Sequence, residues 1–140
     1  MADLSVTAAN VQPSAAAVIL RDYNYGATVT AGQAVYLDAS QTWQLLDIDA
    51  NNIGTNAIGT VRGIAINGGA SGQPAAVCTK DTDFTPGATL TNGSMVYGST
   101  TAGGVTHDVP TTNAYPVSFG LAKSTTKLNL SINASGAIIV

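Results

Sequence analysis

The sequence predicts an all-β fold, a small β-barrel or β-sandwich built from two internally duplicated β units behind an N-terminal arm. The first observation is a repeated segment: GATVTAGQAVY at 26–36 returns as GATLTNGSMVY at 87–97, with seven of the eleven positions identical. The second is composition, because all eight acidic residues are Asp and Thr, Val, Gly and Asn are abundant. Without Glu and with few Lys, long surface helices are disfavoured and strands joined by turns are favoured.

Each copy of the repeated segment reads as a short strand, a turn and a second strand. The turn falls at Ala31-Gly32 in the first copy and at Asn92-Gly93 in the second. Gly tolerates a positive φ, and Asn-Gly is a favoured dipeptide for a tight turn. The repetition therefore indicates architecture rather than catalysis.

A second strand pair follows each copy, so the repeat extends over most of the chain. In the second half, apolar Leu128, Leu130 and Ile132 alternate with polar residues, which is typical of a strand with one buried face. We expect one domain over 26–140, with halves at about 26–80 and 87–140. The acidic stretch 80–83 is expected to be a solvated linker between the halves. Residues 1–25 lie outside the duplication and form an arm that packs on its own domain or reaches a neighbour.

The region 38–47 predicts a hairpin with its turn at 39–41. Trp43, the single Trp, is expected in the core or at a subunit interface rather than stacked on a ligand. Cys78, the single Cys, lies in an apolar strand and is expected to be a small buried hydrophobe. The sequence ends in three large apolar residues that should be buried, so the candidates for an oligomer or shell contact are Trp43, Ile138, Ile139 and Val140.

The sequence contains no complete catalytic or metal-binding motif. His107 and Asp108 are adjacent, so on a strand they point to opposite faces and make no oriented dyad. Residues 47–51 imitate the start of a calcium loop, but Asn52 replaces its glycine and Ile58 its final glutamate. We therefore expect no catalytic residue, no cofactor and no metal, and a protein that is not an enzyme.

Charge and hydropathy also restrict the partners. Charged residues are 9% of the chain, against about 25% in ordinary globular domains, and its five cations are scattered. Nucleic-acid binding lacks its electrostatic basis, and no apolar run is long enough to span a membrane. The N-terminus carries no basic segment of the signal-peptide kind, which predicts synthesis in a cytoplasm. A surface this poor in charge favours burial in an assembly.

Five segments together resemble the small capsid cement, or decoration, proteins of tailed bacteriophages: MADLSVTAANV, GATVTAGQAVYLDASQTWQLLD, GIAINGGASGQPAAVCT, GATLTNGSMVY and KLNLSINASG. The resemblance covers nearly the whole chain. It implies a β-rich, non-enzymatic virion protein on the outside of the assembled head. Such a protein binds the major capsid protein as a homotrimer at three-fold positions and stabilises the shell against packaged DNA.

Two other classes remain open. One is another phage structural component, such as a tail-tube, baseplate or fibre-base protein. The other is a carbohydrate-binding module, whose sugar platforms would be Trp43 and the tyrosines Tyr23, Tyr25, Tyr36, Tyr97 and Tyr115.

Overall fold

The computed structural model describes residues 3–49, 61–111 and 114–134, and within them the fold is all-β, as predicted. Apart from one short 3-10 helix, η1 (Ala8–Asn10), the regular elements are strands. They are β1 (Val18–Leu20), β2 (Asn24–Tyr25), β3 (Ala34–Leu37), β4 (Thr42–Leu45), β5 (Arg62–Ala65), β6 (Val77–Phe84), β7 (Met95–Gly98), β8 (Val105–Thr106), β9 (Val117–Ala122) and β10 (Leu128–Ala134).

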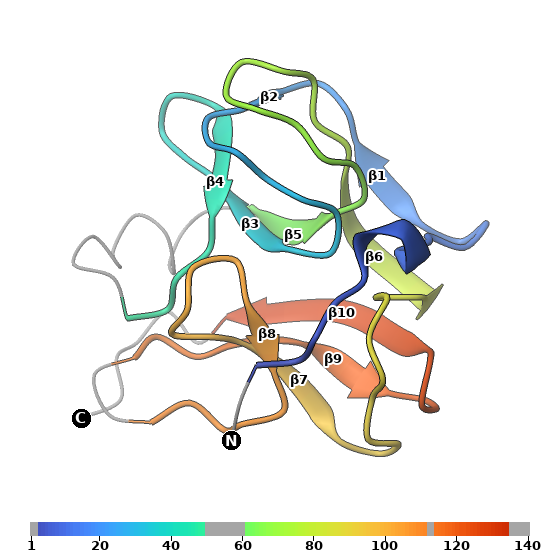
Figure 1. Ribbon diagram of the computed structural model, residues 1–140. Coiled ribbons are helices and arrows are strands. Elements are labelled where there is room, and N and C mark those ends of the chain that lie inside the picture. The colour runs from blue at the N-terminus through green and yellow to red at the C-terminus, as the bar shows by residue number, and fades with distance from the viewer. Residues whose placement is uncertain (1–2, 50–60, 112–113, 135–140) are drawn as a thin grey trace.

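The strands form one sheet in the order β2-β4-β3-β5-β6-β10-β9-β7-β8, with β1 paired to β6 beside this path. The sheet does not close into a barrel, so of the two predicted architectures the sandwich-like one describes the molecule. From β4 to β8 the order is palindromic: β4-β3-β5-β6 of the first half meets β10-β9-β7-β8 of the second at the antiparallel β6–β10 pair. In Figure 1 the first-half strands lie in the upper part of the molecule and β7 to β10 in the lower part.

The repeated segment forms the same hydrogen-bonded corner in both halves. Gly32 and Gly93 have φ of 94° and 84°, the left-handed region that glycine adopts without strain. The Gly32 amide donates to the Ala65 carbonyl at 2.7 Å, and the Gly93 amide donates to that of Ala122 at 2.9 Å. A second pair of equivalent bonds follows: the Val29 amide donates to the Gly69 carbonyl in the first half, and the Leu90 amide donates to the Thr125 carbonyl in the second, both at 2.8 Å. The repetition in the sequence is therefore a repetition of backbone geometry.

Two hydrophobic clusters stack along the molecule. The smaller lies on the side of the first-half strands away from the second half and is composed of Tyr25, Val29, Val35, Trp43, Ala65, Ala75 and Val77. The larger joins the two halves: Ala34, Tyr36, Ile64 and Cys78 of the first pack in one cluster with residues of the second that include Leu90, Val96, Phe119, Ala122, Leu128 and Leu130. The first-half sheet is thus covered on both faces.

The N-terminal segment, drawn in dark blue in Figure 1, packs along its own domain, which is the first of the two arrangements expected for the arm. The Leu4 amide donates to the Val105 carbonyl at 2.8 Å, and the Thr7 amide donates to the Gly87 carbonyl at 2.8 Å. Farther along, β1 pairs with β6. Four apolar side chains of the segment, Leu4, Val6, Val11 and Ala17, pack partly buried against the larger cluster. Residues 3–20 therefore act as a strap that contacts both halves.

The predicted hairpin at 38–47 is present as β3, β4 and a turn at 39–41. Asp38 closes the turn: its carboxylate accepts the Ser40 and Thr42 amides at 3.0 and 2.9 Å and the Thr42 hydroxyl at 2.9 Å. Burial acts to raise the pKa of Asp38, but these hydrogen bonds and one from Gln44 outweigh it and lower the pKa. Gln41 has a φ of 61°, a conformation unusual for a residue with a side chain.

Candidate interaction surface

The acidic stretch 80–83 is not the solvated linker predicted from its charge. It lies within β6, near the centre of the sheet, and Asp81 is fully buried. The Asp81 carboxylate accepts hydrogen bonds from the Ser14 amide at 2.7 Å, from the Ser14 hydroxyl, and from the Asp83 amide at 3.0 Å. Burial acts to raise its pKa, but these donors and the nearby charge of Lys127 outweigh burial, so the pKa is lowered. The prediction was wrong because a residue distant in sequence, on the strap, supplies the donors.

His107 is bound to backbone on both sides of its ring. Its Nε2 accepts the Thr91 amide at 3.0 Å, which leaves Nδ1 to donate to the Met95 carbonyl at 2.8 Å. These two contacts tie the segment after β8 to the second repeated corner. The side chain is partly exposed, and its two nitrogens serve the fold rather than a nucleophile.

The calcium-like segment begins with a local turn. The Asp49 amide donates to Asp47 Oδ1 at 3.2 Å, and residues 50–58, the rest of that segment, lie outside the described residues. Burial, followed by the neighbouring Asp49 side chain, raises the pKa of Asp47 to about 6. Within the described part of the chain, no three His, Cys, Asp or Glu side chains come together as metal ligands.

Of the four candidate contact residues, Trp43 is the one the structure describes, and it is 0% exposed in the smaller cluster. It therefore has no exposed surface for a partner, and of the two predicted locations, core or subunit interface, it occupies the core. Ile138, Ile139 and Val140 lie outside the described residues. Cys78 is buried as predicted, and burial raises the pKa of its thiol to about 11.

The aromatic residues considered as sugar platforms are divided between core and surface. Tyr25 and Tyr36 are buried, as Trp43 is. Tyr23, Tyr97 and Tyr115 are partly exposed. The Tyr25 hydroxyl donates to Asn67, 2.6 Å from Oδ1, and burial raises its pKa to about 12. The three buried rings therefore have no exposed face on which a sugar could stack.

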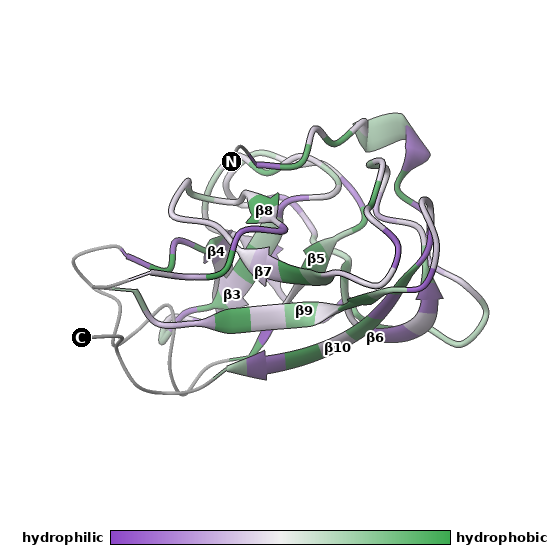
Figure 2. Ribbon diagram, turned by 90° about the horizontal axis from the view of Figure 1, so that it is seen from below, coloured by the Kyte–Doolittle hydropathy of each residue, from purple (hydrophilic) through white to green (hydrophobic). Residues whose placement is uncertain are grey.

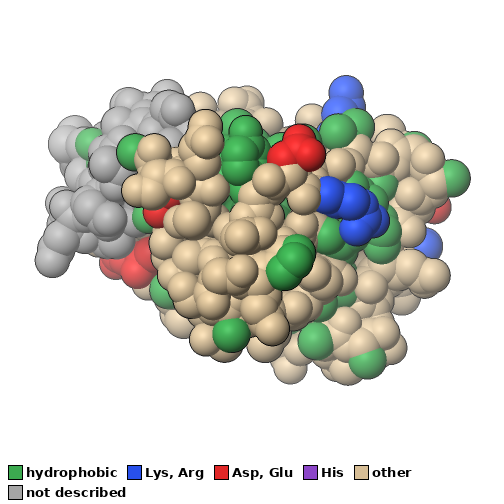
Figure 3. Space-filling model, turned by 90° about the horizontal axis from the view of Figure 1, so that it is seen from above, with side chains coloured by type: hydrophobic (Ala, Val, Ile, Leu, Met, Phe, Trp, Pro, Cys, Tyr) green, Lys and Arg blue, Asp and Glu red, His purple; other side chains and the backbone are tan. Residues whose placement is uncertain are grey.

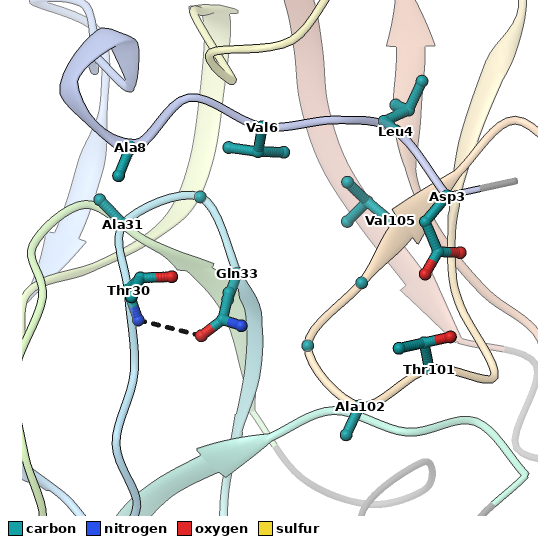
Figure 4. Close-up of a pocket in the computed structure, with 13 residues that line it drawn as sticks. Asp3, Leu4, Val6, Ala8, Thr30, Ala31, Gln33, Thr101, Ala102 and Val105 are labelled. Atoms are coloured by element: carbon teal, nitrogen blue, oxygen red, sulfur yellow. Dashed lines mark hydrogen bonds between the residues drawn. The ribbon is translucent and has the colours of Figure 1, made fainter.

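A pocket of about 240 Å³ lies between the strap and two loops, 30–33 and 101–105 (Figure 4). Its walls are mostly backbone and small side chains, and the Thr30 amide donates to Gln33 Oε1 at 2.9 Å on one side. The one charged group in the lining, Asp3, accepts the Ser99 hydroxyl at 2.5 Å.

Within the described part of the chain, Met95 and Leu121 are exposed on the outer face of the second-half sheet. The strand registers place Met95 opposite Leu121, and Leu121 opposite Asn129, so the three side chains form one row across β7, β9 and β10. Met95 is 37% exposed and Leu121 is 46% exposed. A second row runs parallel to it, and together the two rows make up what we call the open face: Met95, Leu121, Asn129, Tyr97, Ser118 and Asn133. In Figure 2, hydrophobic residues alternate with nearly neutral ones along β9 and with hydrophilic ones along β10.

The open face carries no charged side chain. On the adjacent strand β6, the charged residue Lys80 lies opposite Ser131 of β10. The other side of the molecule, in Figure 3, has isolated charged side chains on a surface formed mainly by uncharged residues and backbone. A neutral sheet face with partly apolar rows is suited to contact with another protein surface.

Comparison with known proteins adds no relatives. No family model matches the sequence, and no curated protein matches it either. Among the described residues, no helix is long and apolar enough to cross a membrane.

Proposed function

We propose that the protein is a capsid cement protein that binds the outside of an assembled bacteriophage head and stabilises the shell against the pressure of packaged DNA. The resemblance of the sequence to cement proteins suggests the class. The structural observation that carries the proposal is the neutral, partly apolar open face on a charge-poor sheet. In this proposal the protein acts as a homotrimer and its partner is the major capsid protein.

Such a protein works by contact alone. If it binds neighbouring subunits of an assembled shell more tightly than free subunits, mass action stabilises the assembled state. Many copies repeat this contribution around the head, so no single contact needs to be strong. The larger cluster joins the two halves and the strap bonds to both, so the two halves can serve this role as one domain.

Binding to purified heads tests the proposal. The protein should sediment with intact heads, remain in solution with unassembled major capsid protein, and raise the temperature at which heads release DNA. Bovine serum albumin at the same concentration is the control for non-specific sedimentation. Binding to purified tails with none to heads would instead support another virion component.

A further inference from the structure

We propose that Asn92, in the repeated corner of the second half, is a site of spontaneous deamidation, and that the fold protects Asn67 from the same reaction. Each of these residues precedes a glycine, and they are the two Asn-Gly pairs of the sequence. Glycine has no side chain to shield the backbone amide that attacks the preceding Asn, so the two pairs share the same intrinsic chemistry. The fold therefore decides which of them reacts.

The reaction requires water and no other partner. The Gly93 amide nitrogen attacks Cγ of Asn92, so a new carbon–nitrogen bond forms. The bond from Cγ to the side-chain nitrogen breaks, and ammonia leaves with the proton of the attacking amide. Water then opens the resulting succinimide ring at either carbonyl. Opening at Cγ gives Asp, and opening at the main-chain carbonyl gives isoaspartate, in which the chain continues through Cγ.

The Asn67 side chain is held by three hydrogen bonds. Its Oδ1 accepts the Tyr25 hydroxyl at 2.6 Å and the Ala76 amide at 3.0 Å, and its Nδ2 donates to the Pro74 carbonyl at 3.2 Å. The Tyr25 ring is itself fully buried in the smaller cluster. Attack on Cγ makes that carbon tetrahedral and displaces both Oδ1 and Nδ2. Ring closure at Asn67 therefore requires these three bonds to break or distort together.

The Asn92 side chain lacks such anchors. It is exposed, and within the described residues no hydrogen bond holds its amide. The attacking group is restrained by the bond from the Gly93 amide to the Ala122 carbonyl at 2.9 Å, so the reaction proceeds through local openings of the corner. The space beside Gly93 is open, because a Cβ built there would meet no atom within 4 Å. The anchors at Asn67 are more numerous and involve a buried ring, so Asn92 reacts first.

The corresponding corner of the first half cannot react in this way. Its turn residues are Ala31 and Gly32, and Gly32 has a φ of 94° where Gly93 has 84°. The same backbone is therefore made with a residue that has no side-chain carbonyl. Deamidation adds a carboxylate to the second corner alone. Isoaspartate also lengthens the backbone just before the amide that bonds to Ala122, so it weakens the contact of this corner with β9.

Ageing the folded protein in mildly alkaline heavy-oxygen water tests the proposal, because ring opening incorporates the label. Peptide mapping by mass spectrometry should find labelled Asp and isoaspartate at Asn92 at least about tenfold faster than at Asn67. The same chain in guanidinium chloride is the reference, and there the two rates should be similar. Asn92→Ala, which copies the first-half corner, should lose the label at that position and leave the rate at Asn67 unchanged. Tyr25→Phe should accelerate the reaction at Asn67 alone, and circular dichroism verifies that both variants are folded.

The wild-type comparison decides the proposal without either variant. Labelling of Asn67 as fast as Asn92 in the folded protein would overturn it. So would an Asn92 that stays unlabelled in the folded protein while the denatured chain reacts at both positions. Rates that differ equally with and without denaturant would assign the difference to neighbouring sequence and also overturn it. A folded Tyr25→Phe variant in which Asn67 reacts no faster would show that its hydrogen bonds give no protection.

Discussion

The two halves of the molecule use one backbone plan for two different environments. In both, the strand after the repeated turn pairs with a strand containing a glycine, Val35 opposite Gly63 and Val96 opposite Gly120. One residue away, the first half places Ala34 and Ile64 in the contact between halves, while the second exposes Met95 and Leu121. The repeat therefore specifies the path of the chain, and side-chain substitutions decide which faces are covered.

The third member of each row illustrates the same point. Cys78 in the first half is small, apolar and buried, whereas its counterpart Asn129 is polar and exposed. A small residue suits a face against which another layer packs closely, and an amide suits one in contact with water or a polar partner. Substitutions in the two halves test this difference.

Gly120→Ala should cause the largest loss of stability. Gly120 has a φ of 137°, and a Cβ there would lie 1.9 Å from the Asn129 carbonyl oxygen, a backbone atom that cannot rotate away. We expect the free energy of unfolding to fall by about 4 kcal/mol or more. The matched variant is Gly63→Ala, whose Cβ would lie 2.4 Å from a movable Val77 methyl and 2.7 Å from the Cys78 carbonyl oxygen. Its cost should be smaller, about 1–3 kcal/mol, and urea denaturation measures both. Equal costs would contradict the expected difference between the two glycine positions.

Ile64→Ala and Leu121→Ala compare the covered and open rows directly. Ile64 is buried between the halves, so its truncation should cost about 2–4 kcal/mol through lost burial and a residual cavity. Leu121 is exposed in the single chain, so its truncation should cost less than about 0.5 kcal/mol. Similar losses at the two positions would mean that the open face is covered within the chain.

Ser14→Ala tests the strap, which binds β6 through Asp81. Losing the hydroxyl donor to a buried carboxylate should cost about 1–3 kcal/mol at pH 7. Because the folded-state pKa of Asp81 is lowered, its stabilisation is present above the unfolded value of about 3.9 and is lost as pH falls through the folded pKa. The difference between wild type and Ser14→Ala should therefore shrink below about pH 4 in urea titrations. Ser131→Ala, at an exposed position of β10, is the control; a pH-independent difference would show that Asp81 is not involved.

Gln41→Gly should produce the smallest effect, and it is stabilising. The β3–β4 turn holds Gln41 at a φ of 61°, whereas the corresponding β7–β8 turn has Gly103 at 78°. Glycine relieves the left-handed strain, and the free energy of unfolding should rise by about 0.5–1 kcal/mol. Thermal melting of Gln41→Gly beside Gln41→Ala, which keeps the strain, measures the gain. A loss of stability in the glycine variant would mean that the Gln41 side chain contributes more than the strain removes.

The sequence was sufficient for the local features. The repeated glycines, the turn at 39–41 and the alternation in 128–132 predicted the corners and strands, because turn and strand preferences are local. It did not predict that 80–83 belongs to a strand with Asp81 buried, because two of the donors to Asp81 come from Ser14, 67 residues away. Nor did it identify the open face: Met95 and Leu121 become neighbours only through strand register. Aligning the two repeated segments would have shown that Met95 replaces the small Ala34 at the same position.

Electron microscopy of purified bacteriophage virions incubated with the protein tests the proposed cement function. The cement proposal predicts density for this all-β domain on the outer surface of the head, at three-fold and quasi-three-fold positions, with the major capsid protein beneath it. Antibody or gold labelling of an exposed site such as Val109→Cys would identify the density independently. Label confined to the tail, or virions that lack the protein altogether, would contradict the claim.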